Sequence, residues 1–277
     1  MKADNNGIFG FMKKLIAPPF TTSLPASAWF RVAAMPADAT YPEHSHRWGE
    51  FVYSFSGIME VQIGSELLTA PPHFGIWIPP EVTHVGLNRN TATHCSFYMM
   101  PEICTGMPTT PCAIKINEFT ISILDFLKEH PLSAPLSEGD MRLLLVLHDQ
   151  LSAAPRQSTF LPYTNDPLLS RVTAEIERCP AMETPIKEIA EKFGYTVRTL
   201  NRRSHQLLGM SLGDWRQRLR VVKAIDLLEQ GEKVEVVAYT VGYRSASAFI
   251  SMFHRMTGRT PGSICTRHRQ SEDPQEH

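Results

Sequence analysis

The stretches that decide the fold are Ala190-x3-Gly194-Tyr195 and Ala238-x3-Gly242-Tyr243, because the second repeats the first 48 residues later. Gly209-Met210-Ser211 also recurs, 49 residues later, as Gly258-Arg259-Thr260. Self-similarity at a fixed distance indicates that one structural unit has been used twice. The C-terminal part of the chain is therefore predicted to hold two copies of the same unit.

Each copy predicts two short helices joined by a tight turn. The apolar residues before Gly194 and Gly242 have helical spacing, and glycine is the usual residue at the end of a helix. Thr196 and Ser245 follow, and their hydroxyls can accept from the free N–H groups of a new helix. Two helices joined in this way form a helix-turn-helix, whose second helix can enter the major groove of DNA.

One longer helix is predicted between the copies, over residues 214–230. Trp215, Leu219, Val222 and Ile225 have helical spacing there. The helix would be roughly 25 Å long at 1.5 Å per residue. That length could set two reading helices at adjacent major-groove faces, about 34 Å apart.

Positive charge is concentrated in the same region. Residues 184–269 hold 15 Lys and Arg against 7 Asp and Glu, a balance of +8 in a chain whose net charge is −1. Segregated positive charge favours binding to DNA phosphates through counterion release. The alternative is a pair of ordinary helical hairpins with solvated charges, but it does not explain why repeat, turn chemistry and charge coincide.

The second copy resembles the signature of the AraC/XylS family of transcriptional regulators in the run Gly242-Tyr243-x-Ser245-x-Ser247-Ala248-Phe249-x3-Phe253-His254-Arg255-x2-Gly258-x-Thr260-Pro261. The resemblance covers about 100 residues. Ser204 departs from it, because the first reading helix of the family normally carries a core aromatic residue there. Ile264-Cys265 also replaces the usual aromatic and basic ending. The resemblance implies a cytoplasmic regulator that binds double-stranded DNA, with RNA polymerase as a further partner.

The two reading helices are expected to contribute unequally. In the first, Val197, Leu200 and Leu207 are assigned to the core, which leaves residues 198, 201 and 202 outside. Arginine suits guanine and asparagine suits adenine, whereas the second helix offers short side chains for phosphate anchoring. The predicted DNA-contacting residues are Thr196, Arg198, Asn201, Arg202, Arg216, Arg220, Ser245, Ser247, Ser251 and Arg255.

The N-terminal half has the pattern of an all-β domain. Short β-rich runs broken by Pro and Gly begin at Trp29 and continue to Met99, which suggests a small barrel or sandwich. The fold class is therefore α+β with two domains. We assign residues 1–28 to a loosely tethered tail, 29–152 to a cupin-like barrel with following helices, 153–165 to a linker and 166–277 to the DNA-binding domain. Pro167 is expected to begin a helix capped by Asp166.

A histidine-rich motif lies inside this β region. His44, His46 and Glu50 share strand parity, and His84 follows from another strand. The spacing HxHx3Ex6G resembles the cupin motifs, although His73 and Glu81 stand where the second motif prefers glycines. Two interpretations stay open: the four residues hold a divalent transition metal, or the histidines only face a ligand. No cofactor is required. The predicted effector-binding residues are Trp29, His44, His46, Trp48, Glu50, Trp77 and His84.

Two helices are predicted after the barrel, over residues 118–129 and 137–151. The second carries Leu143, Leu144, Leu147 and Leu151, more apolar surface than one barrel face should need. Simple core packing is one explanation. A homodimer interface is the other, and we favour it.

The bulk composition limits the remaining classes. Five cysteines without paired spacing indicate reduced thiols, as in a cytoplasmic protein. The N-terminus lacks the long apolar core of a signal peptide or membrane span. We expect a non-enzymatic, effector-responsive transcriptional regulator that activates a nearby promoter. Two alternatives remain: a cupin metal-dependent oxygenase, which would not need the repeated unit, and a constitutive DNA-binding protein without an effector.

Overall fold

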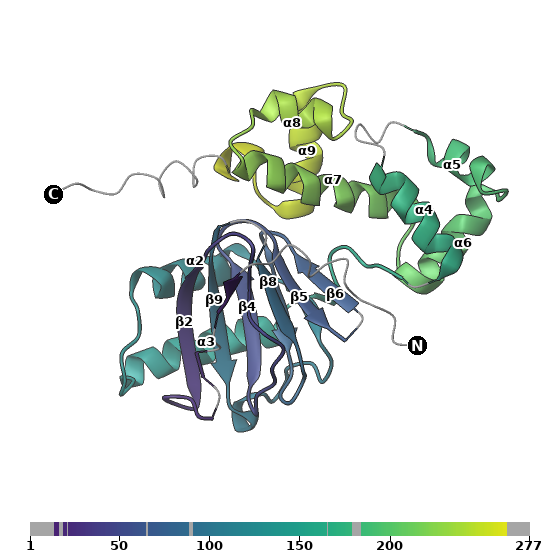
Figure 1. Ribbon diagram of the computed structural model, residues 1–277. Coiled ribbons are helices and arrows are strands. Elements are labelled where there is room, and N and C mark those ends of the chain that lie inside the picture. The colour runs from purple at the N-terminus through teal and green to yellow at the C-terminus, as the bar shows by residue number, and fades with distance from the viewer. Residues whose placement is uncertain are drawn as a thin grey trace. The chain divides into compact units, whose positions relative to one another are not determined.

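The computed structural model describes residues 14–16, 19–20, 22–64, 66–88, 91–164, 166–178 and 184–264. The chain divides into two compact units, Met1–Phe160 and Leu161–His277 (Figure 1). The first unit is rich in β-strands and the second is helical, which confirms the predicted two-domain α+β organisation. Within the ranges above, no helix combines the length and apolar character needed to cross a membrane.

The described strands of the first unit form two sheets. The five-stranded sheet has the order β1-β3-β8-β5-β6, and the six-stranded sheet has the order β11-β10-β7-β4-β9-β2. The predicted closed barrel is therefore not found among these strands. The bounds are β1 Lys14–Leu15, β2 Ala28–Met35, β3 Ala39–Thr40, β4 Gly49–Ser54, β5 Met59–Ile63, β6 Glu66–Ala70, β7 Phe74–Ile78, β8 Val85–Asn88, β9 Ala92–Met99, β10 Cys112–Lys115 and β11 Arg156–Gln157. A short 3-10 helix, η1, covers Pro101–Ile103.

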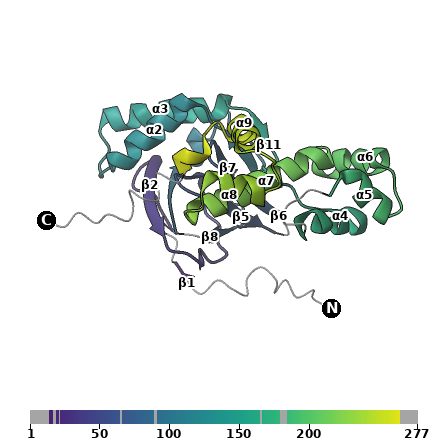
Figure 2. The ribbon, with the colours of Figure 1, turned by 90° about the horizontal axis from the view of Figure 1, so that it is seen from above.

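The six-stranded sheet has two buried faces with different surroundings. Phe51 of β4 pairs with Trp77 of β7 and Phe97 of β9, and all three join one apolar core. Helices α2 (Glu118–Glu129) and α3 (Glu138–Ala153) lie side by side and add buried side chains to that core (Figure 2). Because successive side chains alternate across a sheet, the neighbouring residues Val52 and Ser96 point the other way and line a pocket.

Helix α3 is mostly a core helix. Ser137 and Asp140 form a capping box at its start, which satisfies free N–H groups of the first turn. Three leucines on one side are fully buried: Leu144, Leu147 and Leu151. Leu145 and Val146 are 40% and 39% exposed. Core packing therefore explains much of the apolar surface noted in the sequence, and only part of it is left for a partner.

Part of the predicted N-terminal tail is structured. β1 pairs with β3, so residues 14 and 15 belong to the five-stranded sheet. The ring of Phe20 meets Tyr98 edge-on, with centroids 5.5 Å apart. The description of residues 1–28 as a loose tail is wrong for these residues, while residues 1–13 lie outside the described ranges.

The predicted linker is also largely packed. β11 pairs with β10, and Phe160 N donates to Thr69 O at 3.0 Å. Two residues later, Pro162 O accepts from Trp215 Nε1 at 2.7 Å, within the second unit. The Pro, Ser and Thr content of residues 153–165 suggested a linker, but polar side chains also suit an edge strand that lies beside only one neighbour.

The second unit contains the predicted pair of helix-turn-helix units. Its helices are α4 Pro167–Arg178, α5 Ile186–Lys192, α6 Val197–Leu208, α7 Leu212–Glu229, α8 Val234–Thr240 and α9 Ala246–Thr257. Gly194 and Gly242, between the helices of each pair, have φ angles of 75° and 85°, a region that favours glycine. Thr196 caps α6 and Ser245 caps α9, as the repeat predicted.

Helix α7 connects the two pairs, as predicted. It has 18 residues, which corresponds to about 27 Å. In Figure 1 it runs from the α4, α5 and α6 group to α8 and α9. Trp215, Leu219 and Ile225 are buried along it, so one helix takes part in the cores of both pairs.

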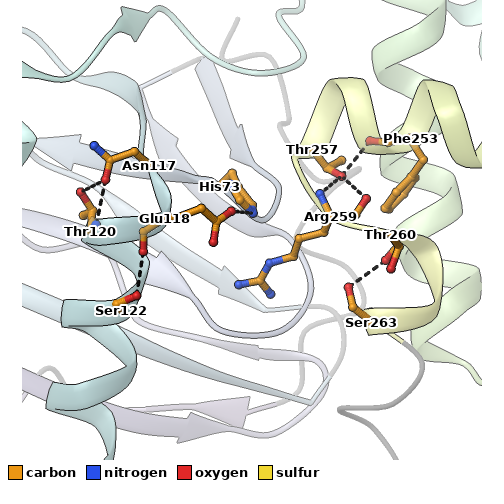
Figure 3. Close-up of polar contacts among 10 residues, drawn as sticks. All are labelled: His73, Asn117, Glu118, Thr120, Ser122, Phe253, Thr257, Arg259, Thr260 and Ser263. Carbon is orange, nitrogen blue, oxygen red and sulfur yellow. Dashed lines mark hydrogen bonds and ion pairs between the residues drawn. The ribbon is translucent and has the colours of Figure 1, made fainter.

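The end of α9 is fixed by local hydrogen bonds. Gly258 takes the left-handed conformation with φ 74°. Thr257 Oγ1 donates to Phe253 O at 2.8 Å and accepts from Arg259 N at 3.2 Å (Figure 3). The hydroxyl of Ser263 donates to Thr260 O at 2.8 Å in the following turn. Gly209 ends α6 in the same conformation, with φ 71°, so the recurring Gly209 and Gly258 positions are C-caps.

Two residues of the first unit explain a departure noted in the sequence. His73 and Glu81 stand where the cupin motif prefers glycines, and their φ angles are 69° and 65°. Left-handed backbone there is what a glycine would adopt most easily. Nε2 of His73 lies 3.6 Å from Oε1 of Glu118, the first residue of α2 (Figure 3).

Candidate functional site

Helix α6 buries one side against the second unit's core. Leu200, Ser204 and Leu208 are buried, whereas Leu207 is 48% exposed. The assignment of Leu207 to the core is therefore wrong. The buried side of the helix is centred on Ser204, a small polar residue that the apolar pattern did not mark as core. Leu208 lies on that side, whereas Leu207 does not.

The opposite side of α6 carries free cationic groups. Thr196 accepts from Thr199 N at 3.2 Å, which fixes the start of the helix. Arg198 and Arg202 are exposed, and no hydrogen bond or ion pair engages either of them within the described part of the chain. A guanidinium that projects freely from the first turns of a reading helix can contact guanine or a phosphate.

Asn201 and Arg203 on the same helix are already engaged. Asn201 Oδ1 accepts from Leu212 N at 3.0 Å. Arg203 donates to Asp166 through Nε at 3.0 Å and also through Nη2. The hydrogen bonds from Arg203 and from Leu169 N lower the pKa of Asp166 to about 2. A bidentate base contact by Asn201 would have to use the same oxygen, which the bond from the buried Leu212 N–H holds toward the start of α7.

Helix α9 has a different exposed face. Ser245 caps it by accepting from Ala248 N at 3.3 Å. Ser247, Ile250 and Ser251 are exposed, and none of them can make a bidentate base contact. Arg255 donates from Nη2 to Gln217 Oε1 of α7 at 3.1 Å. The structure thus places the predicted residues of α9 on the surface, with short side chains where α6 has arginines.

The predicted phosphate-binding residues of α7 have partners inside the second unit. Arg216 Nη1 donates to Thr184 O at 2.8 Å. The guanidinium of Arg220 lies over the ring of Tyr243, 5.0 Å from its centroid. These contacts hold the connecting helix to both helix pairs. A role for Arg216 and Arg220 at phosphates stays a prediction.

A pocket lies inside the first unit between its two sheets. It is a cavity of about 50 Å³, small beside the ~300–1,000 Å³ of drug-binding pockets. One part of the wall is polar: Tyr41, His44, Glu50, His84, Asn88, His94, Ser96 and Tyr98. The rest is mainly apolar: Pro19, Met35, Val52, Met59, Val61, Ile78, Gly86 and Leu87. An apolar wall with a few convergent polar groups is typical of a site for a small molecule.

The four residues of the histidine motif come together beside this pocket, and three of them line it, whereas the predicted effector-binding residue His46 does not. His44 and His84 are joined by a β-bridge, and their ring centroids are 4.3 Å apart. Ligand nitrogens of His44, His46 and His84 lie within 4.8 Å of one another. Glu50 Oε2 is 3.0 Å from Nε2 of His46 and 3.6 Å from Nε2 of His84. The predicted cluster of His44, His46, Glu50 and His84 is therefore present.

Backbone carbonyls fix the orientation of the three rings. Each Nδ1 lies next to a carbonyl oxygen: His44 with Pro42 at 2.8 Å, His46 with Trp48 at 2.7 Å, and His84 with Val82 at 2.9 Å. A carbonyl oxygen only accepts, so Nδ1 of each ring carries a proton. In a neutral ring, Nε2 then has no proton and can only accept a hydrogen bond or bind a cation. Glu50 is an acceptor too. A cation, either a proton or a metal ion, is needed between Nε2 and the carboxylate.

The electrostatics of the cluster follow from burial and proximity. Burial alone would raise the pKa of Glu50, but the hydrogen bond with His46 and the nearby His84 ring hold it well below its usual value. Burial opposes the charged form of His84, yet the carboxylate of Glu50, 3.6 Å away, leaves the pKa of His84 raised. Burial and the neighbouring His84 lower the pKa of His44. The cluster thus keeps an ionised carboxylate inside the unit.

Three of the predicted effector-binding tryptophans lie outside the pocket lining. Trp77 is fully buried in the core on the opposite face of the sheet, where its Nε1 donates to Pro108 O at 2.7 Å. Its indole lies over Gly49, where a Cβ would be 2.1 Å from the ring. Trp48 is buried behind the wall and stacks on His46. Trp29 pairs in register with Tyr98 but does not line the cavity.

Sequence reasoning missed residues on β9. His94, Ser96 and Tyr98 line the pocket and alternate with the core residues of the same strand. Burial and the nearby Arg31 lower the pKa of His94 to about 4. The period-two pattern of residues 94–99 was a signal for this face, since polar and apolar side chains alternate there.

Known proteins match this chain along much of its length. A family model described as a helix-turn-helix domain matches residues 189–267. The HTH-type transcriptional regulator NimR of Escherichia coli (strain K12) is 30% identical over 242 residues, 87% of this chain and 88% of NimR. The HTH-type transcriptional activator RhaS of Citrobacter koseri is 32% identical over 122 residues, 43% of this chain and 44% of RhaS. The structure of ToxT from Vibrio cholerae O395 is 12% identical, covering 87% of this chain and 97% of its own, with a TM-score of 0.37.

Two reading helices on a repeated frame, with free arginines on the first, define a DNA-binding protein. Its partner is double-stranded DNA. The similarity to NimR extends over most of both chains, and it identifies the family as well as the class of protein. The chain belongs to the AraC/XylS-type family of HTH transcriptional regulators, and the relatives named above are transcriptional regulators.

Proposed function

We propose that this regulator activates transcription in response to a small molecule that binds between the two sheets of the first unit. Helix α6 enters the major groove, and α9 anchors a neighbouring segment of the operator. The observation that carries the proposal is the partly apolar pocket with its convergent polar wall, in a chain whose other unit reads DNA. An activator acts where the chromosome and RNA polymerase are, which places the protein in the cytoplasm with polymerase as a partner.

The effector site is tested with single variants of the full chain. The operator is first found by selection from a random DNA library, and small molecules are then screened for a shift in operator binding. His44→Ala is expected to abolish the shift while leaving DNA affinity without effector unchanged. His130→Ala is the matched control, because His130 is exposed at the end of α2. An equal loss of response in both variants would contradict the assignment.

The division of labour between the units gives a second test. A fragment of residues 161–277 includes Pro162 and Tyr163, which contact Trp215 of the second unit. It should bind the operator and ignore the effector, since a ligand shifts an equilibrium only through differential affinity for two states. A fragment that still responds would place the effector site in the DNA-binding unit.

The histidine cluster supports a metal site. Three imidazoles and one carboxylate suit a divalent transition metal, and the carbonyls at Nδ1 leave each Nε2 to bind it. His44, His46, His84 and Glu50 would hold the ion, which would supply a fixed positive charge to the pocket wall. Elemental analysis of untagged protein should find about one Zn, Ni, Fe or Mn per chain, with less in acid.

A matched pair of histidine variants separates metal from a polar wall. His84→Ala should lose the ion, whereas His94→Ala should keep it, because His94 lines the pocket outside the cluster. Metal-free protein that still responds to its effector would make the cluster a hydrogen-bonded wall. The same cluster is the one feature that favours an oxygenase, and oxygen uptake with a turned-over substrate would be needed to support that alternative.

Exposed apolar side chains on the two helices of the first unit support a homodimer. Leu145 and Val146 of α3 are exposed, as are Phe119 and Phe126 of α2 at 54% and 50%. A contact between copies would cover such side chains. Leu144 is not suitable as a probe, because it is fully buried and a charge there would disrupt the core.

The dimer is tested by its mass in solution. Val146→Asp should give a folded monomer with weaker operator binding, since two linked reading units gain effective concentration. Val236→Asp is the control, a similarly exposed apolar residue of α8 in the second unit, outside both reading helices. A monomeric wild-type chain at micromolar concentration would overturn the dimer.

A further inference from the structure

The start of α7 is held by side chains of α6. Leu212 is the first residue of α7, so its N–H has no acceptor inside the helix, and the residue is fully buried. Asn201 Oδ1 accepts from this N–H at 3.0 Å. Ser211, the N-cap, serves Asp214 N instead, at 3.1 Å. Asn201 is therefore the described partner of a buried donor that the helix cannot satisfy.

A second bond from α6 reaches the same connection. Ser204 lies almost one turn after Asn201, and its Oγ donates to Met210 O at 2.7 Å. Residues 210 and 212 are thus bonded from two places on α6. Because Ser211, the N-cap of α7, lies between them, these two bonds fix the direction in which α7 leaves α6. A change at Asn201 would alter the orientation of the whole reading helix relative to α7.

The exposed arginines of α6 are in a different situation. Arg198 and Arg202 are four residues apart, about 6 Å along the helix, which is a little under two base pairs. Within the described residues neither has a partner to release before it contacts DNA. Asn201, in contrast, needs both its oxygen and its nitrogen for adenine, and its oxygen is held toward the buried N–H of Leu212.

We propose that Asn201 is a positioning residue that fixes α6 against α7, and that α6 reads bases through Arg198 and Arg202, which favour guanines nearly two base pairs apart. This assignment rests on α6 being the helix that enters the major groove. Asn201 acts on DNA recognition only through the orientation of the two arginines.

The key variant is Asn201→Asp in the full chain. Aspartate keeps an oxygen for Leu212 N, and a negative charge is favourable at a helix N-terminus. It lacks the amide donor that adenine N7 requires. In selection from a random DNA library, Asn201→Asp should enrich the same bases as wild type at every position. Its affinity should fall by a similar factor for all sequences, because it adds a negative charge near phosphates.

Asn201→Ala gives an independent readout. It leaves Leu212 N unsatisfied, so the midpoint of thermal unfolding of the second unit should fall below that of Asn201→Asp. A base-reading residue on the surface would give equal midpoints. Loss of an adenine preference at one position in Asn201→Asp, with the rest of the profile intact, would overturn the proposal.

The arginines are tested with charge held constant. Arg202→Lys keeps the attraction to phosphates but loses the bidentate fork, so discrimination for guanine at one position should fall by about ten-fold or more while overall affinity is largely kept. Arg198→Lys should do the same at a position nearly two base pairs away. Unchanged profiles in both variants would overturn the assignment. A wild-type chain that enriches no sequence would instead remove the reading role of α6 itself.

Discussion

The two reading helices occupy equivalent places in the repeat but carry different chemistry. α6 and α9 both have 12 residues, begin at a hydroxyl cap and end at a left-handed glycine. With a shift of 49 residues, Arg198 and Arg202 of α6 correspond to Ser247 and Ser251 of α9. The frame is thus repeated while the outer face is not. The difference indicates that caps and turns specify the fold, and that exposed residues are free to divide recognition between the helices.

The buried faces differ as well. Ser204 in α6 corresponds to Phe253 in α9, and both are fully buried. Phe253 packs on Phe249, with ring centroids 5.5 Å apart. Ser204 instead donates a hydrogen bond to Met210 O. The first copy therefore uses a polar bond to its connecting turn where the second uses aromatic packing.

The largest expected effect comes from these core positions. Phe253→Ala should lower the free energy of unfolding around α9 by about 3–5 kcal/mol through the cavity it leaves. Ser204→Ala should cost about 0.5–1.5 kcal/mol around α6, because the partly buried carbonyl of Met210 loses its donor. Hydrogen exchange at the amides of each helix measures the two effects separately. Equal losses would mean that the two copies are not stabilised differently.

The next effect is on base preference. Arg202→Ala should cost about 1–3 kcal/mol on the preferred operator and relax one base position. Ser251→Ala, at the equivalent place in α9, should change affinity by less than about 0.5 kcal/mol. Titrations with a set of single-base operator variants measure both. If Ser251 dominated sequence preference, the division between the helices would be reversed.

A smaller effect is expected in the salt dependence. If α9 anchors phosphates through Arg255, Arg255→Gln should weaken all sequences alike and reduce the slope of log affinity against log salt by about one. Ser247→Ala should leave that slope unchanged, since it removes no charge. Binding measured at several salt concentrations checks this. An unaltered slope in Arg255→Gln would leave Arg255 with its bond to Gln217 as its role.

The smallest effect concerns the ion pair that only the first copy has. Asp166 binds Arg203 of α6, whereas the residue equivalent to Arg203 in α9 is the buried Met252. The hydrogen bond from Arg203 lowers the pKa of Asp166 to about 2, below its ordinary 3.8. Its stabilising contribution should be present above about pH 4 and lost as the pH falls through about 2. The stability difference between wild type and Asp166→Asn, measured against pH, should therefore shrink across that window.

The repeat made the helical unit the easiest part to predict. Capping residues and left-handed glycines act locally, so Thr196, Ser245 and the two C-cap glycines could be placed from spacing alone. Leu207 was misplaced because the centre of the buried arc, Ser204, is polar. The burial of Ser204 depends on its hydrogen bond to Met210 O, which hydrophobic periodicity does not reveal.

The site residues of the β-rich unit were harder to predict. Alternating side chains define the two faces of a strand, but they do not show which face lines the pocket. The histidine motif predicted the cluster, since its residues come from one strand end and one bridge. Trp77 was assigned to the ligand and Tyr98 was missed, although strand register places them on opposite faces of one sheet. The pairing of β4 with both β7 and β9 decides this, and pairing is a long-range property.

Helix α7 has a consequence for how operators can vary. A continuous helix of 18 residues cannot change length without turning everything beyond it, since each added residue rotates the next by about 100°. The distance and the angle between the two reading helices, α6 and α9, are therefore fixed by α7. In DNA, one extra base pair between the two contacted segments of the operator turns the second segment by roughly 34° about the duplex axis. Operators of this protein should tolerate base substitutions between the two contacted segments more readily than a single inserted or deleted base pair there.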